Sequence, residues 1–72
     1  MGALSNISGK EAVKIFCRFG YVVDHRTGSQ IILYHVSRPT LSIPNHKEVA
    51  PGLLRSQIRK SGLTVEEFLR LK

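Results

Sequence analysis

Residues 21–46 read YVVDHRTGSQIILYHVSRPTLSIPNH, and this stretch holds nearly all the strand-forming residues of a 72-residue chain. Aromatic and β-branched side chains favour strands, whereas glycine and proline mark the turns between them. The pattern predicts strands and turns in this order: a strand over Tyr21–Asp24, a reversal at Arg26-Thr27-Gly28, a central strand over Ser29–His35, a turn at Ser37-Arg38-Pro39 and a strand over Thr40–Ile43. The centre of the stretch, Thr27-Gly28-Ser29-Gln30, is where we place the hairpin turn. Pro44 ends the last strand because proline donates no hydrogen bond to a sheet. We therefore expect an antiparallel meander.

Helical segments flank the meander on both sides. Ser8 and Glu11 have the spacing of a capping box, and Gly20 suits the left-handed conformation that closes a helix. After the strands, Pro51 is well placed as the first residue of a second helix that Gly62 ends, and another capping box opens a short third helix. Strands flanked by helices predict an α+β fold of two layers, helix, three-stranded antiparallel sheet and helix. The helices then cover one sheet face and leave the other open to a partner.

The chain is long enough for one domain, residues 1–72, of which we expect residues 1–7 to be flexible. Its hydrophobic fraction of 42% is typical of a globular protein. No apolar run approaches the roughly 18 residues that predict a membrane span. Residues 1–7 lack the basic-then-apolar layout of a signal peptide, so we expect a cytoplasmic protein. The single cysteine, Cys17, lies in a helical segment, where we expect it to be buried in the packing.

The charge of the chain points to an anionic partner. A net charge of +6 is large for this length and favours RNA, DNA, an anionic membrane surface or an acidic protein over a role in solubility alone. Basic residues beside the predicted turns and on the second helix are candidates to hold phosphates: Arg26, Arg38, Lys47, Arg55, Arg59 and Lys60. For Arg59 and Lys60 an ordinary solvated helix face is an equally good interpretation.

Motifs for cofactor chemistry are missing from the sequence. It has no nucleotide-binding glycine loop, zinc-ligand spacing, paired-carboxylate site or nucleophile elbow, so we expect no metal and no cofactor. Histidine titrates near neutral pH, so His25, His35 and His46 suit acid–base chemistry or RNA contact, yet each also fits an idle surface histidine. Their spacing is too uneven to predict a metal site.

Six short segments in this order resemble the HicA toxin family, and the resemblance runs from about Ser8 to the end of the chain. They are Ser8-Gly9-Lys10-Glu11-Ala12-Val13, Gly20-Tyr21, Gly28-Ser29, Ile43-Pro44-Asn45-His46-Lys47-Glu48, Gly52-Leu53-Leu54-Arg55 and Gly62-Leu63-Thr64. The resemblance implies a fold similar to the double-stranded-RNA-binding domain, which agrees with a meander between helices. It also implies an endoribonuclease that cuts messenger RNA without a metal and does not bind DNA by itself. A HicB antitoxin is implied as the partner that covers the RNA-facing surface and holds the nuclease inactive.

Position 30 departs from the family pattern. In the family a catalytic histidine follows a Gly-Ser pair, which here is Gly28-Ser29, but position 30 is glutamine. A carboxamide exchanges no proton near neutral pH, and the loss of acid–base help costs about 10²- to 10⁴-fold in rate. We therefore predict a nuclease site at Gly28, Ser29 and Gln30, beside His46 and Lys47, that is crippled or inactive. Glutamine keeps hydrogen-bonding capacity at similar size, so binding of RNA and of the antitoxin is expected to survive.

Three hypotheses for function follow. The first is a HicA-type toxin with RNA-binding residues Arg26, Arg38, His46, Lys47 and Arg55. The second is a non-catalytic RNA-binding module that uses the same surface, and the third is a domain that binds an acidic protein. Cleavage restored in Gln30→His would favour the first over the second. An RNA affinity that does not weaken with salt would argue against both RNA hypotheses, because phosphate contacts release counterions.

Overall fold

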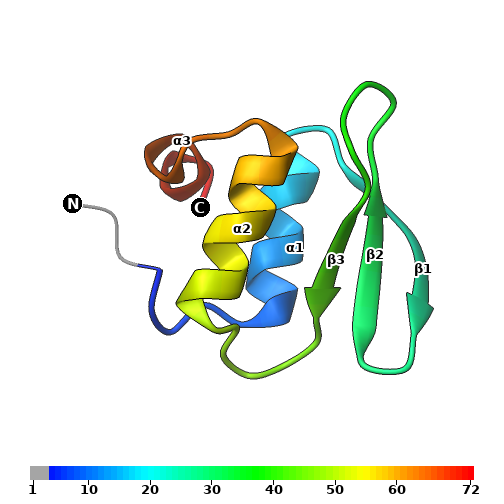
Figure 1. The fold of residues 1–72 in the computed structure, drawn as a ribbon, viewed down its shortest axis with the longest axis horizontal. Helices are drawn as coiled ribbons and strands as arrows, with labels where there is room; N and C mark the ends of the chain where they lie inside the picture. The colour runs from blue at the N-terminus through cyan, green and yellow to red at the C-terminus, as the bar shows by residue number, and fades with distance from the viewer. Residues whose placement is uncertain (1–3) are drawn as a thin grey trace.

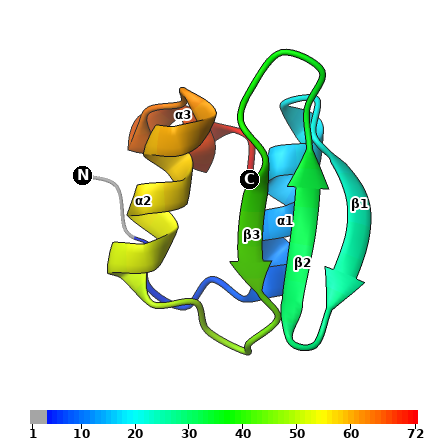
Figure 2. The same ribbon diagram turned by 45° about the vertical axis from the view of Figure 1, so that its right-hand side comes forward.

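The computed structural model describes residues 4–72. Its elements follow the order α1 (Gly9–Arg18), β1 (Val22–Thr27), β2 (Gln30–Tyr34), β3 (Leu41–Pro44), α2 (Pro51–Ser61) and α3 (Val65–Arg70). The strands form one antiparallel sheet in the order β1-β2-β3. The helices pack on one side of the sheet (Figure 1), and the face turned toward the reader in Figure 2 carries no helix. The predicted two-layer α+β fold is confirmed.

The turn between β1 and β2 is a tight two-residue hairpin. β1 continues through Arg26 and Thr27, and Thr27 pairs with Gln30, so Gly28-Ser29 alone makes the turn. A two-residue hairpin needs a positive φ at its first central residue, and Gly28 supplies it with a φ of +55°. The hairpin turn at Thr27-Gly28-Ser29-Gln30 is therefore confirmed, whereas the placement of Arg26 in the turn was wrong, because the tightest hairpin leaves Arg26 and Thr27 in the strand.

The register decides which side chains face the helices. Ile31 and Leu33 of β2 lie opposite Ile43 and Leu41 of β3, and all of them are buried. Side chains alternate along a strand, so Gln30, Ile32 and Tyr34 lie on the open face. β1 is exposed along its whole length, and its register with β2 shifts between Val23 and His25 through a bulge at Asp24.

The core gathers around Phe16 of α1. Its ring centroid lies 5.0 Å from that of Phe68 in α3 and 5.7 Å from that of Tyr21. Leu4 and Ile7 are also buried in this core, and Val49 N donates to Ile7 O at 2.8 Å. The expectation of flexibility for residues 1–7 stays a prediction, and the structure places the apolar side chains of Leu4 and Ile7 in the core. Residues 1–3 lie outside the described part of the chain.

The predicted helix ends are confirmed. Ser8 Oγ accepts from Glu11 N at 3.0 Å, Pro51 begins α2, and Gly62 closes it with a φ of +90°. The first predicted capping box is only half formed, because the Glu11 carboxylate pairs with Lys72 Nζ at 3.5 Å rather than with Ser8 N. The second capping box is formed by Thr64 and Glu67, with each side chain bonded to the other residue's backbone N–H. None of the helices within residues 4–72 is long and apolar enough to cross a membrane.

Cys17 was predicted to be buried, and this was wrong. Ala12, Ile15 and Phe16 turn toward the core, while the next residue along the helix is rotated by about 100° away from Phe16. Cys17 is exposed, although the remaining partial burial raises the pKa of its thiol.

Candidate functional site

The hairpin turn meets two other segments at one end of the sheet. Asn45 N, in the loop after β3, donates to Ser29 O at 2.6 Å, and Gln30 pairs with Pro44. The next residue of that loop, His46, accepts a hydrogen bond of 2.9 Å from the backbone N of Gly9 at the start of α1. Turn, loop and helix start thus converge at the lower end of the sheet in Figure 1. His46 and Lys47 are exposed and follow Asn45 directly, so the loop that carries them contacts the Gly28-Ser29 turn.

Gly9 permits this close approach. A Cβ at position 9 would overlap the carbonyl oxygen of Pro44 and lie 3.0 Å from Asn45 Cα. Real Cβ atoms essentially never come so near to backbone atoms, so the loop sits against α1 only because this residue is glycine. The position of the loop is therefore set by the start of α1.

Gln30 is held on the open face by a chain of hydrogen bonds. Ser42 Oγ of β3 donates to Gln30 Oε1 at 2.8 Å, and Ser42 N donates to Gln57 Oε1 of α2 at 3.2 Å. β3 is an edge strand, so its outward N–H needs a partner, and Gln57 supplies it. The sequence analysis missed both Ser42 and Gln57. The alternating pattern of β3 was a signal that Ser42 faces away from the core, but nothing local pointed to Gln57.

Two predicted RNA-binding residues lie away from this site. Arg38 belongs to the β2–β3 loop, at the opposite end of the sheet from the hairpin turn (Figure 1). Its Nη1 donates to Ser61 O at 3.0 Å and its guanidinium lies 4.7 Å from the ring centroid of Phe19, so it joins loop, α1 and α2. Arg55 lines a shallow hollow beside Thr64, on the side of α2 toward α3. The structure does not bring Arg38 or Arg55 to Gln30.

Arg26 has an intermediate position. It lies opposite Ile31 and therefore on the helix side of the sheet, whereas Gln30 is on the open face. Since the adjacent Thr27 pairs with Gln30, Arg26 is near the turn but approaches it from the other side of the sheet. Within residues 4–72, no group of three or more His, Cys, Asp and Glu side chains is arranged to hold a metal ion.

The comparison with protein families now bears on this site. A family model described as the HicA toxin of bacterial toxin–antitoxin systems matches residues 9–63. The chain belongs to the HicA toxin family. The match runs from the first residue of α1 to just beyond α2, and so includes the sheet, the hairpin turn and the loop with His46. No curated protein and no solved structure matches the chain significantly.

Family membership makes the chain a HicA-type toxin of a toxin–antitoxin system, with an antitoxin as its protein partner. It confirms the resemblance noted in the sequence, and the observed α+β arrangement agrees with it. α3 lies outside the matched residues, yet Phe68 packs on Phe16, so in this HicA-family chain α3 belongs to the same core.

The three histidines of this HicA-family chain differ in their surroundings. His25 lies opposite Ile32, which puts it on the open face with Gln30, and its Nδ1 is 2.6 Å from Asp24 Oδ2. His35 packs against Tyr21, with ring centroids 4.9 Å apart, and its Nδ1 accepts from Ser37 N at 3.1 Å. His35 is thus tied into the structure at the end of the sheet that carries Arg38. His25 and His46 are the two histidines near the Gly28-Ser29 turn.

Proposed function

We propose that this chain is an RNA-binding toxin whose nuclease centre lies at Gly28, Ser29 and Gln30, and that Gln30 leaves it with little or no cleavage activity. One observation carries the proposal: Gln30 opens β2 on the uncovered face, directly after the turn, and its side chain is oriented by Ser42 Oγ at 2.8 Å. The HicA toxin family supports the toxin role.

The chemistry explains why the residue at position 30 matters. Metal-independent cleavage of RNA requires a group that takes the proton of a ribose 2′-hydroxyl and a group that protonates the leaving 5′-oxygen. A neutral imidazole at position 30 could donate its N–H to Ser42 Oγ, which leaves its other nitrogen unprotonated and able to take the proton of the 2′-hydroxyl. The carboxamide of Gln30 accepts a hydrogen bond from the same Ser42 hydroxyl but exchanges no proton, so the rate falls by about 10²- to 10⁴-fold.

The surroundings suit an anionic substrate. Lys47 and His46 are exposed in the loop that contacts the turn. In this proposal the Lys47 ammonium binds the phosphate next to the reacting ribose. The open face presents the exposed side chains of Val22 and Tyr34 beyond the site. In this proposal the cytoplasmic antitoxin is of the HicB type and covers this face, which keeps messenger RNA away from position 30.

The test compares the parent chain with Gln30→His and with Tyr34→His, each incubated with a mixed-sequence messenger RNA in EDTA. Tyr34 lies on the same face of β2 but at its far end, so Tyr34→His is a matched control for the added imidazole. We expect cleavage by Gln30→His alone, with RNA binding by all three proteins.

The other outcomes are equally informative. Cleavage by the parent chain would overturn the role given to Gln30, and His25→Asn would then show whether the histidine on the same face carries the reaction. RNA binding without cleavage by any variant would favour the non-catalytic RNA-binding module. If none of the three proteins binds RNA, the remaining hypothesis is a domain that binds an acidic protein.

A further inference from the structure

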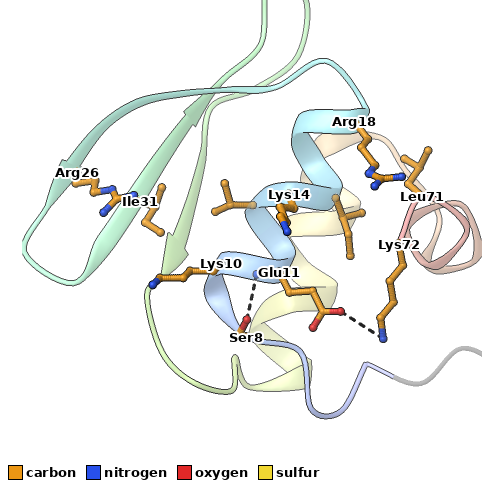
Figure 3. Close-up of a pocket in the computed structure, with 11 residues that line it drawn as sticks. Ser8, Lys10, Glu11, Lys14, Arg18, Arg26, Ile31, Leu71 and Lys72 are labelled. Atoms are coloured by element: carbon orange, nitrogen blue, oxygen red, sulfur yellow. Dashed lines mark hydrogen bonds and ion pairs between the residues drawn. The ribbon is translucent and has the colours of Figure 1, made fainter.

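A basic hollow lies on the side of the molecule away from the open sheet face. It has a volume of about 630 Å³ and is bounded by α1, the helix side of the β1–β2 hairpin and the residues that follow α3. Figure 3 shows its cationic side chains around the rim: Lys10, Lys14 and Arg18 from α1, Arg26 from β1, and Lys72. The sequence analysis did not predict this hollow, and of these residues it singled out only Arg26.

The charges of the hollow are largely uncompensated. Its one carboxylate, Glu11, lies 3.5 Å from Lys72 Nζ. Among residues 4–72, Lys10, Lys14 and Arg18 form no ion pair, and neither does Arg26. On α1 the three cations are spaced four residues apart, which places like charges beside one another and destabilises the helix. An anion bound from solution would relieve this repulsion.

The lining of the hollow also contains apolar side chains. Val13 and Leu71 are half-buried there, and Ile31, only 2% exposed, lies beside Arg26 (Figure 3). A small inorganic anion makes no favourable contact with apolar side chains. A nucleotide, in contrast, can place its base against these side chains and its phosphate against the cations. The i, i+4 spacing on α1 separates successive cations by roughly 6 Å along the helix axis, which suits consecutive phosphates of an extended strand.

The hollow and the candidate nuclease centre adjoin at the hairpin end of the sheet. Lys10 follows Gly9, whose N–H bonds to His46, and Arg26 precedes Thr27, which pairs with Gln30. In Figure 3, Arg26 and Lys10 lie at one side of the hollow while Arg18 and Lys72 lie at the other. An RNA strand held at the turn therefore has a cationic path leading away from it along α1.

We propose that this basic hollow is a second RNA-binding site, in which Lys10, Lys14, Arg18 and Arg26 hold the phosphates of nucleotides flanking the cleavage position. The proposal rests on the proposed function, because it takes RNA as the ligand of the neighbouring centre. It assigns binding to α1, outside the loop residues His46 and Lys47. An acidic segment of a protein partner is the competing occupant, and the experiment separates the two.

The experiment uses the full chain and a fluorescein-labelled 12-nucleotide RNA, with affinity measured by fluorescence anisotropy over a range of salt concentrations. The double variant Lys10→Gln/Lys14→Gln is compared with Arg59→Gln/Lys60→Gln, which removes the same charge from the exposed surface of α2. We expect the first to weaken binding on the order of tenfold. Affinity falls as salt rises, and each lost phosphate contact should make the slope of log affinity against log salt less steep by about 0.7. The α2 variant should change both quantities much less than Lys10→Gln/Lys14→Gln does.

A second readout uses the native cysteine. Cys17 is exposed and lies three residues from Lys14, on the same side of α1. RNA bound along the helix should slow the alkylation of Cys17 by iodoacetamide in the parent chain and less so in Lys10→Gln/Lys14→Gln. Polyglutamate serves as the probe for an acidic protein segment in the same assay.

The outcomes separate this proposal from the proposed function. If both double variants weaken RNA binding equally, or if Lys10→Gln/Lys14→Gln leaves RNA binding unaltered, the hollow is not an RNA-binding site. Either result would leave the proposed nuclease centre unaffected. Protection of Cys17 by polyglutamate but not by RNA would assign the hollow to a protein partner. Failure of the parent chain to bind RNA would instead overturn the proposed function itself. Matching thermal unfolding of the variants and the parent shows that the fold is retained.

Discussion

Replacement of Gly9 by alanine tests how α1 positions the loop of the candidate site. The added Cβ would overlap the carbonyl oxygen of Pro44 and approach Asn45 Cα to 3.0 Å, so the loop or the start of α1 must move. The hydrogen bond from Gly9 N to His46 O, 2.9 Å long, would be stretched or lost. Both neighbours are backbone, which cannot swing aside as a flexible side chain does.

The magnitude follows from three contributions. Overpacking costs about 1–3 kcal/mol, and a lost backbone hydrogen bond costs about 0.5–1.5 kcal/mol. Alanine also reduces the conformational freedom of the unfolded chain, which offsets about 0.4–1 kcal/mol of this cost. We therefore expect Gly9→Ala to lower the free energy of unfolding by roughly 0.5–4 kcal/mol. For a domain of this size Tm falls by about 4–8 °C per kcal/mol.

Gly52→Ala is the matched control, because Gly52 also lies in the first turn of a helix and a Cβ there meets no heavy atom within 4 Å. We expect it to stabilise the protein by about 0.4–1 kcal/mol. Urea and thermal unfolding measure both variants. In the Gln30→His background, Gly9→Ala should also reduce RNA cleavage more than Gly52→Ala, because it moves the loop with His46. Equal effects of the two variants on stability would refute the argument that α1 sets the loop.

Two further predictions concern the other end of the sheet. Tyr21→Phe removes the hydrogen bond from the hydroxyl to Pro39 O, 2.8 Å long, and should cost about 1 kcal/mol at neutral pH. Burial raises the pKa of Tyr21 above its usual 10.0, against a smaller opposing effect of Arg38, so folding favours the neutral phenol. The native protein should therefore keep this stability below about pH 10 and lose it, relative to Tyr21→Phe, as the pH rises through the folded-state pKa in urea titrations. Arg38→Ala should cost about 1–3 kcal/mol in urea unfolding, because it loses both the bond to Ser61 O and the contact with Phe19, and should affect RNA affinity less than Lys47→Ala does. A stable Arg38→Ala variant with RNA binding abolished would contradict the structural role given to this arginine.

Much of the fold was predictable because its signals are local. The N-cap side chains of Ser8 and Thr64, the proline at the start of α2 and the glycine at its end act within one helical turn, and the structure has these four where the sequence indicates. The alternation of Thr40–Ile43 likewise predicted a half-buried strand. The predicted site residues Gly28, Ser29, His46 and Lys47 also come together, since the loop after β3 bonds to the turn before β2.

The remaining features depend on contacts between distant parts of the chain. Ser42 and Gln30 are separated by 12 residues, Gln57 and Ser42 by 15, and Arg38 and Ser61 by 23. No local pattern encodes these pairs, because they depend on the register of the strands and on where α2 crosses the edge of β3. The same holds for the basic hollow, which joins cations of α1 to one of β1. The sequence by itself determined the order of the elements, their ends and the chemistry at position 30. Only the tertiary structure decided which cations share a surface, because that depends on how helix and sheet pack and not on the spacing of residues along the chain.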